Sequence, residues 1–384
     1  MTCRYGRRVR SGPPTLHPDQ PVAPELRRGR GATGNPTGRF EPRARVAGDG
    51  NYHYADLGWS EHEEETAPVP LQTTVSEDAT RTIIAHNASP DLGFSQSINP
   101  YRGCEHGCVY CFARPSHEHF GLSVGLDFET KLFAKPNAAA LLRQELASPR
   151  YKASVLAIGT NTDPYQPVER RLGIMRSILE VLSECNHPVG IVTKSHLVTR
   201  DADILSSMAK RGLAMVHLSV TTLDRALARR LEPRAATPPK RLDAIRTLAE
   251  AGVPVGVMTA PIIPGLNDVE IEAILEAAWD AGARSAGKTL VRLPHGVKDL
   301  FQNWLAEHAP GRASHVMSLI RSTRDGHDND PRFFARMKGS GAYAEMIDLR
   351  FRTACQRLGF NKERKKLDLG QFKPPSLDGQ LALW

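Results

Sequence analysis

Apolar and polar residues alternate in a regular way from about residue 95 onward. Short apolar runs that fit buried strands are each followed by a longer segment with apolar residues at helical spacing. The helix after the second run, for example, places Ile174, Ile178 and Val181 on one face. The predicted strands are 95–101, 154–160, 189–194, 214–221, 253–260 and 286–293.

About six strand–helix repeats with strands apolar on both faces predict a parallel sheet, either an open doubly wound sheet or a barrel. In both folds the chemistry lies at the carboxyl ends of the strands. Polar or unusual residues follow five consecutive strands: three cysteines after the first, then "GTNTDPY", "TKS", "SVTTLD" and "PIIPGLND". Five strand ends that meet at one edge indicate a functional site more strongly than any single motif.

The two ends of the chain differ from this central region. Residues 1–90 are rich in Pro and Gly and keep no period, which predicts an irregular basic N-terminal extension. Ten Arg and four acidic residues lie in 1–50, so this segment holds most of the formal charge of +8. It is either a disordered or loosely packed arm or a phosphate-contacting arm. Residues 301–384 predict a helical extension, clearest over 341–359, followed by a basic tail.

The composition is that of a protein with a proper core, with 40% hydrophobic and 24% charged residues. No apolar run approaches the length of a membrane span, and the N-terminus lacks the apolar stretch of a secretory signal. We therefore expect a cytoplasmic protein with no membrane partner, in a compartment that keeps thiols reduced. Clustered cysteines there indicate a metal site or catalysis rather than disulfides.

Three of the six cysteines lie within "CEHGCVYC", with the spacing C-x3-C-x2-C. Cys104, Cys108 and Cys111 could bind structural zinc with His106 or His117 as the fourth ligand. A ferredoxin-type cluster needs a fourth cysteine, and the other three are remote in sequence. A third interpretation is a [4Fe–4S] cluster whose fourth iron stays open for a substrate or cofactor.

The motif resembles that of radical S-adenosylmethionine (SAM) enzymes, C-x3-C-x-aromatic-C. Within that superfamily the chain is most similar to proteins related to spore photoproduct lyase. The similar segments are "GCEHGCVYCFARPSHE", "DFETKLFAKPNAAALLRQEL", "GTNTDPYQPVE", "TKSHLVTRD" and "APIIPGLND". The resemblance covers roughly residues 90–300, so we expect a radical SAM core at 91–300, an α/β fold that forms a partial (β/α)6 TIM-type barrel.

The resemblance implies a [4Fe–4S] cluster and SAM as cofactors. By position, Cys104, Cys108 and Cys111 would bind the cluster, and SAM would chelate the open iron. Reductive cleavage of SAM would give a 5′-deoxyadenosyl radical that abstracts hydrogen from a substrate. An electron donor such as flavodoxin or ferredoxin is implied as a partner.

The resemblance also assigns the SAM contacts by position, with an ordinary structural role open for several of them. Tyr110 and Phe112 would lie near the adenine, and residues after the second strand would hold the amino end. Lys194 would contact the carboxylate and Ser219 the ribose. The full set of expected SAM-binding residues is Tyr110, Phe112, Thr160, Asn161, Asp163, Lys194, Ser219, Ile263 and Gly265.

One departure from the lyase group leaves the substrate open. Those lyases use a further cysteine near the second strand as hydrogen donor, and here no cysteine lies between Cys111 and Cys185. Tyr165 is an alternative radical relay, or simply a surface tyrosine. The substrate is either DNA or RNA, or a protein, peptide or small molecule. A non-catalytic iron–sulfur or zinc protein is the third hypothesis.

Overall fold

The computed structural model describes residues 22–40, 71–363 and 366–376, and the larger of its two sheets carries the predicted strands. From one edge to the other its strands are β10 (Ser285–Leu290), β9 (Val255–Ile262), β8 (Ala214–Ser219), β7 (Val189–Thr193), β6 (Leu156–Ile158), β3 (Gln96–Ile98) and β2 (Ile84–His86). Neighbouring strands from β10 to β3 run parallel, and β2 pairs antiparallel with β3. Six parallel strands confirm the predicted α/β fold. Over the described residues the edge strands β10 and β2 do not pair, so the barrel is partial.

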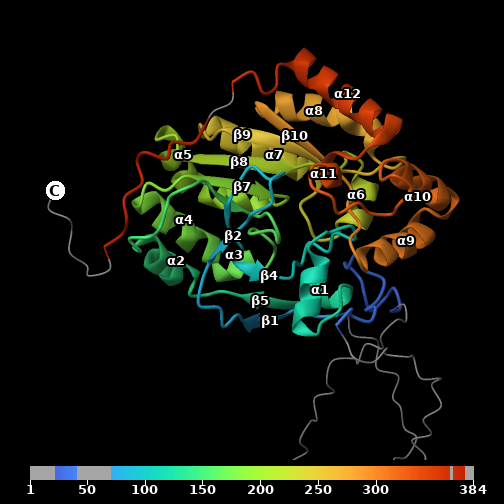
Figure 1. The fold of residues 1–384 in the computed structure, drawn as a ribbon, viewed down its shortest axis with the longest axis horizontal. Helices are drawn as coiled ribbons and strands as arrows, with labels where there is room; N and C mark the ends of the chain where they lie inside the picture. The colour runs from blue at the N-terminus through green and yellow to red at the C-terminus, as the bar shows by residue number, and fades with distance from the viewer. Residues whose placement is uncertain (1–21, 41–70, 364–365, 377–384) are drawn as a thin grey trace, which may run out of the picture.

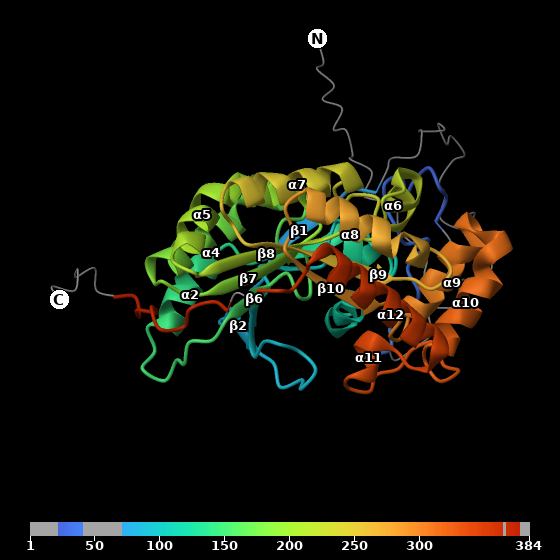
Figure 2. The same cartoon turned by 90° about the horizontal axis from the view of Figure 1, so that it is seen from above.

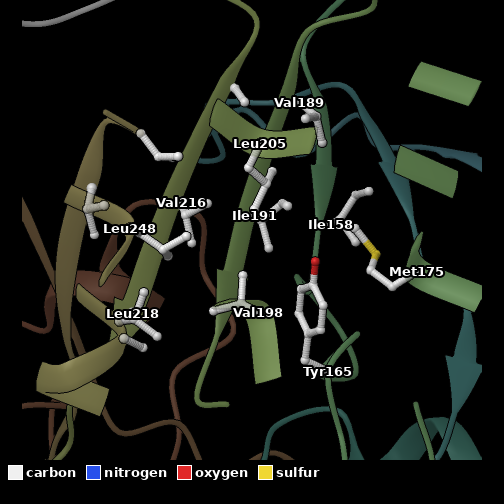
Figure 3. Close-up of a cluster of buried hydrophobic side chains, with 14 of the residues drawn as sticks. Ile158, Tyr165, Met175, Val189, Ile191, Val198, Leu205, Val216, Leu218 and Leu248 are labelled. Carbon is white, nitrogen blue, oxygen red and sulfur yellow. The ribbon is translucent and has the colours of Figure 1, made fainter. Parts of the chain in front are cut away.

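Helices connect the parallel strands and pack along one side of the sheet, as Figure 2 shows for α5, α7 and α8. The connecting helices are α1 (Leu126–Thr130), α2 (Ala138–Leu146), α3 (Glu169–Leu172), α4 (Ile174–Glu184), α5 (Ala202–Lys210), α6 (Arg225–Leu231), α7 (Pro238–Glu250) and α8 (Ile271–Asp280). This side of the sheet and the apolar faces of the helices form the main core. Figure 3 shows part of it, with Ile158, Ile191 and Val216 from three neighbouring strands facing helix side chains.

A second, three-stranded sheet has no counterpart in the sequence prediction. Its strands are β1 (Thr74–Glu77), β5 (Lys131–Ala134) and β4 (Tyr101–Arg102). β1 and β2 both lie within the range 1–90 that the sequence predicts to be irregular. β1 pairs with the distant β5, and strands of three or four residues carry too little periodicity to be predicted from sequence. This sheet lies beside α1 in Figure 1 and supports the loop that follows β4.

Residues 22–40 are irregular in backbone but tightly packed. Val22 and Ala32 are buried against Val124 and Leu126. Arg27 pairs with Glu307 at 2.6 Å, and Arg30 donates to the carbonyl oxygen of Glu129 at 2.9 Å. These two arginines are therefore held by intramolecular partners and are not part of a free phosphate-contacting arm. The rest of the Arg-rich segment, 1–21 and 41–70, lies outside the described residues.

The C-terminal region is largely helical, as predicted. Its helices are α9 (Val297–His308), α10 (Ala313–Ser322), α11 (Ala335–Lys338) and α12 (Gly341–Leu358). α12 packs on α8 (Figures 1 and 2). The following segment 366–376 runs back along the core in extended form, where Phe372 contacts His187 and Tyr151 edge-on.

Candidate active site

A cavity of about 430 Å3 lies at the carboxyl ends of the parallel strands and contains all three clustered cysteines. The cysteine loop, residues 103–112, forms one wall. Residues at the carboxyl ends of β6, β7, β8, β9 and β10 form much of the rest, so the four later strand ends expected from the sequence meet the cysteines, and the end of β10 joins them. The lining residues on which the arguments below depend are Cys104, His106, Cys108, Tyr110, Cys111, Phe112, Gly159, Thr160, Asn161, Asp163, Lys194, Ser219, Ala260, Pro261, Arg292, Arg336 and Met337.

The cysteine loop is fixed by backbone hydrogen bonds on both sides. Cys104 N donates to Phe128 O at 2.9 Å, and Val109 N donates to Leu231 O at 3.1 Å. Gly107 has a φ of +68°, and a Cβ there would come within 2.8 Å of the Glu129 carboxylate. Glycine at this position therefore lets the loop turn tightly between two of its cysteines.

A buried ion pair lies directly behind the loop. The carboxylate of Glu129 accepts from Arg114 Nη2 at 2.5 Å and from the backbone N–H groups of Gly31 and Ala32 at 2.9 and 2.8 Å. Arg114 Nε in turn donates to the carbonyl oxygen of Cys108 at 2.9 Å. Both charged side chains are fully buried. Segment 22–40, the Glu129 side chain and the cysteine loop are thus one connected unit.

The three thiols suit a metal cluster in chemistry and position. None of the five described cysteines forms a disulfide. Burial, with the Asp163 carboxylate nearby, raises the pKa of Cys104. Burial and Glu232 likewise raise the pKa of Cys108, although Lys194 opposes the shift. Thiolates in this place need a compensating cation, and a bound iron–sulfur cluster would provide one.

The Asp163 carboxylate connects the loops at the carboxyl ends of neighbouring strands. Its carboxylate accepts from Thr193 Oγ1 and Lys194 N, both at 2.7 Å, and from Tyr165 N at 2.9 Å. Nδ1 of the buried His106 lies 3.4 Å from its Oδ2. Burial raises the pKa of Asp163, but His106 and these hydrogen bonds outweigh it and lower the pKa to about 2. The carboxylate stays ionised and ties the β6 and β7 loops to the cysteine loop.

Tyr110 is locked by a buried charge network. Its hydroxyl donates to Glu232, which also pairs with Arg241. Burial and Glu232 raise the pKa of Tyr110, so the phenol stays protonated. Burial raises the pKa of Glu232, while Arg241 and Lys194 lower it to a net value of about 2. With its hydroxyl held, Tyr110 can present only its ring to the cavity.

Lys194 and Ser219 lie together in the cavity, as expected for residues at neighbouring strand ends. Lys194 Nζ donates to Ser219 Oγ at 3.3 Å and lies 6.0 Å from the centre of the Tyr110 ring. Thr160 and Asn161 line the cavity in the β6 loop, which approaches β7 closely. A Cβ at Gly159 would come within 1.9 Å of Val192 O, so only glycine allows this approach.

Two expected SAM contacts are not on the cavity wall. Ile263 and Gly265 are both described, and neither is among the residues that line the cavity. Ile263 is fully buried in the cluster beneath α9 and α10, and Gly265 forms a turn against Leu319. Ala260 and Pro261, within the last residues of β9 before its end at Ile262, line the cavity instead. A role for Ile263 and Gly265 in SAM binding therefore stays a prediction that the cavity lining does not support.

The structure also changes the interpretation of two other side chains, Tyr165 and His117. Tyr165 is not a surface residue: it is fully buried in the main core, and its hydroxyl donates to Asp201 (Figure 3). It is also not among the described residues that line the cavity, which removes the basis for a radical relay. His117, one possible zinc ligand, bonds through Nε2 to Lys131 O at 2.9 Å and lies outside the cavity lining. Across the described residues, no three His, Cys, Asp or Glu side chains are arranged to hold a single metal ion.

Comparison with known proteins agrees with this geometry. Residues 98–278 match the family model of the radical SAM superfamily. An uncharacterised protein of Mycobacterium tuberculosis is 37% identical over 232 residues, which are 60% of this chain and 68% of that protein. An uncharacterised protein of Methanocaldococcus jannaschii is 30% identical over 179 residues, 46% of this chain and 64% of that one. The chain belongs to the radical SAM superfamily.

The fold is shared with solved structures of spore photoproduct lyase. One variant of that enzyme superposes with a TM-score of 0.54 at 14% identity, over 74% of this chain and 80% of the other. Another, with bound S-adenosylmethionine and a dinucleoside spore photoproduct, gives 0.51. At this identity the similarity establishes the fold alone. Among the helices of the described residues, none is both long and apolar enough to cross a membrane.

Several residues of the site were not predicted from the sequence. Arg292, Arg336 and Met337 line the cavity from the region after β10 and from α11, beyond the segments that resemble known motifs. Glu129 and Arg114 support the cysteine loop from behind. Glu129 lies in the "DFETK" stretch of a segment that resembles the lyase group, but nothing in its local sequence indicates that it is buried.

Proposed function

We propose that this protein is a radical SAM enzyme in which Cys104, Cys108 and Cys111 bind a [4Fe–4S] cluster and SAM occupies the adjoining cavity. The observation that carries the proposal is the convergence of three reduced cysteines with polar residues from the ends of β6, β7, β8 and β10 on one cavity. When bound, the cluster and SAM supply reductive cleavage of the C–S bond to a 5′-deoxyadenosyl radical. The fold similarity to spore photoproduct lyase supports this reaction class.

The chain's own residues would bind and orient SAM. Lys194 offers a cation for the carboxylate, and Ser219 beside it offers a hydroxyl for the ribose. Thr160 and Asn161 offer polar groups for the amino end. Tyr110 offers a ring face to adenine. Asp163 keeps these loops in register, a positioning role, because its oxygens are already engaged by protein donors.

The substrate proposal is hydrogen abstraction from a nucleic acid, with a protein, peptide or small molecule as the alternative. The solved relative with a dinucleoside photoproduct supports the first. Literal repair of that photoproduct is disfavoured, because the hydrogen-donor cysteine is absent. Cys185 and Cys355 are buried in the main core and do not replace it.

A basic groove beside the cysteine loop supports docking of an acidic electron carrier such as flavodoxin or ferredoxin. The groove, about 510 Å3, is lined by the exposed side chains of Arg225, Arg229, Lys240 and Arg246. Of the two carboxylates that line it, Glu232 pairs with Arg241 and Asp243 with Lys240.

The groove borders the cluster loop directly. Pro233, on its wall, is 3.2 Å from the position of a Cβ on Gly107, and Arg234 N donates to His106 O. A carrier bound here would lie next to the cysteine loop. Positive charge at the docking face speeds association with an acidic partner.

Anaerobic reconstitution tests the proposed chemistry. We expect four irons and four sulfides per chain, a spectral change on addition of SAM, and 5′-deoxyadenosine after reduction with dithionite. C108A should lose cluster and product, whereas C185A, a change in the core, should keep both. A colourless protein with one zinc, or unchanged product from C108A, would refute the assignment.

The docking groove has a separate test. With flavodoxin as reductant, R225E/R229E should form 5′-deoxyadenosine at least 10-fold more slowly at low salt, and the difference should shrink as salt rises. With dithionite, which does not dock, the rates should match wild type. R150E/K210E, an equal charge reversal at exposed sites elsewhere, is the control. Equal losses in both double variants would exclude a specific groove.

A further inference from the structure

Arg292 is a cation in the cavity for which the described residues supply no salt bridge. It follows β10, and its Nε is buried with no hydrogen-bond partner. Its Nη1 lies 3.8 Å from the sulfur of Met337, a weak acceptor. The fully buried Arg114 and Arg241, by contrast, are neutralised by Glu129 and Glu232. A desolvated guanidinium without a carboxylate is costly unless a ligand completes it.

The nearest acidic group is already engaged. Asp91 accepts from Arg336 through Nε at 2.7 Å and Nη2 at 2.5 Å, and also from the backbone of Phe334. Burial and the neighbouring Arg336 lower the pKa of Arg292, while Asp91 opposes this. Arg324, also buried, lies close enough to Arg292 for the two charges to repel, although Asp330 offsets part of the charge of Arg324. The local charge balance thus leaves this part of the cavity positive.

Apolar and aromatic side chains surround the Arg292 guanidinium. Its central carbon lies 5.0 Å from the centre of the Phe112 ring, which is 44% exposed. Leu92, Phe94 and Met337 line the same cavity. An oxyanion at Arg292 would therefore lie next to surfaces that favour an apolar or aromatic group.

Arg292 is also displaced from the residues proposed to bind SAM. β10 lies two strands from β8, which carries Ser219, and three strands from β7, which precedes Lys194. At about 4.8 Å per strand, these positions are on the order of 10–14 Å apart along the sheet. Lys194 and Arg292 therefore serve different parts of the cavity, and one carboxylate on SAM does not account for both.

We propose that Arg292 is the anion-binding residue of a substrate subsite, and that the substrate carries a phosphate or carboxylate next to an apolar or aromatic group. Phe112 belongs to this subsite rather than to the adenine site, and Tyr110 alone faces adenine. The inference rests on the proposed function, since it takes the remainder of the cavity to be filled by SAM. It narrows the substrate to an organic anion.

Equilibrium dialysis on the cluster-loaded, unreduced protein saturated with SAM tests the subsite. The probes are phenyl phosphate, phenylacetate and neutral phenylacetamide. Wild type should bind at least one anionic probe about 10-fold more tightly than the amide, since charge-assisted hydrogen bonds are the strong ones. The better of the two anions identifies phosphate or carboxylate. No preference for either anion would overturn the proposal.

Substitutions at Arg292 then assign that preference to the side chain. R292Q should abolish it, and R292K should keep part of it. R284Q changes an exposed arginine over Trp279 at the opposite end of β10 and should bind as wild type does. An unchanged preference in R292Q refutes the proposal, and R292K provides the same comparison if R292Q does not fold.

Two further outcomes distinguish a failure of the Arg292 subsite from a failure of the proposed radical SAM function. If R292Q loses affinity for SAM rather than for the anionic probes, the arginine serves the SAM carboxylate and the subsite is wrong. If wild type forms no 5′-deoxyadenosine, the proposed function fails, while anion preference at Arg292 is still decided by the dialysis.

Discussion

Glu129 is the residue whose replacement best tests how the cysteine loop is held. Its carboxylate binds three donors: Arg114, and the backbone N–H groups of Gly31 and Ala32. E129Q removes the charge and keeps one acceptor oxygen, which leaves Arg114 buried with carbonyl partners only. Breaking a buried pair in this way costs about 3–5 kcal/mol. Because Arg114 keeps the carbonyl oxygens of Cys108, Val124 and Gly125, we expect the lower end, about 3 kcal/mol.

The assay is anaerobic thermal unfolding followed by circular dichroism, together with cluster loss to a chelator. With about 2.1 cal/mol/K of unfolding entropy per residue, a destabilisation of this size should lower Tm by roughly 4 °C in a chain of this length. Cluster loss should also be faster, because the loop loses its support. The control is E272Q, whose partner Arg350 lies in a half-exposed pair on the surface and should contribute less than about 1 kcal/mol. A Tm for E129Q equal to that of E272Q would refute the argument.

Two other predictions follow from the same structure. K194Q should weaken SAM binding at least 10-fold in dialysis, because the cation beside Ser219 is lost. The iron content should not change, since Lys194 is not one of the proposed cluster ligands. An unchanged affinity for SAM would show that Lys194 does not bind it. Burial lowers the pKa of His187 from 6.5 to about 4. The unfolded chain therefore protonates His187 more readily than the folded protein does. As a result, the free energy of unfolding that His187 contributes above pH 6.5 is lost as the pH falls toward 4. Between pH 6.5 and 5 this loss is about 2 kcal/mol in urea unfolding, and H187Q should flatten it; equal pH profiles would show that other groups dominate.

Because residues 22–40 are packed against the core, a deletion that tests the Arg-rich segment for nucleic-acid binding should leave them in place. Removal of residues 1–50 would also remove Gly31, where a Cβ would come within 1.8 Å of the Gly107 carbonyl oxygen. Such a deletion would disturb the cysteine loop as well as any nucleic-acid contact. A truncation that stops at residue 20 leaves this packing intact. Salt-sensitive binding of DNA or RNA should be compared between that form and the full chain.

The repeating pattern of the chain was enough to predict the six parallel strands and the edge at which they carry polar residues. In runs such as 189–194 and 214–221, buried residues alternate with half-buried ones along the strand, and the apolar composition that predicts these strands is a local property of the sequence. The spacing of Cys104, Cys108 and Cys111 is likewise local, so the candidate cluster ligands and their position after the first strand needed no structure. The resemblance to radical SAM enzymes rests on these same local segments.

Tertiary structure alone decided which distant residues share a wall with the cysteines. Arg292 and Arg336 reach the cavity only because β10 and α11 fold back against it, and Ile263 leaves it because the chain turns into a different core. Glu129 pairs with Arg114, 15 residues earlier, and accepts a hydrogen bond from the backbone of Gly31, 98 residues earlier. Contacts of this kind depend on three-dimensional packing, which periodicity and motif spacing do not encode. For that reason the sequence identified the chemistry of the cluster site, and the fold determined the part of the cavity proposed to bind the substrate.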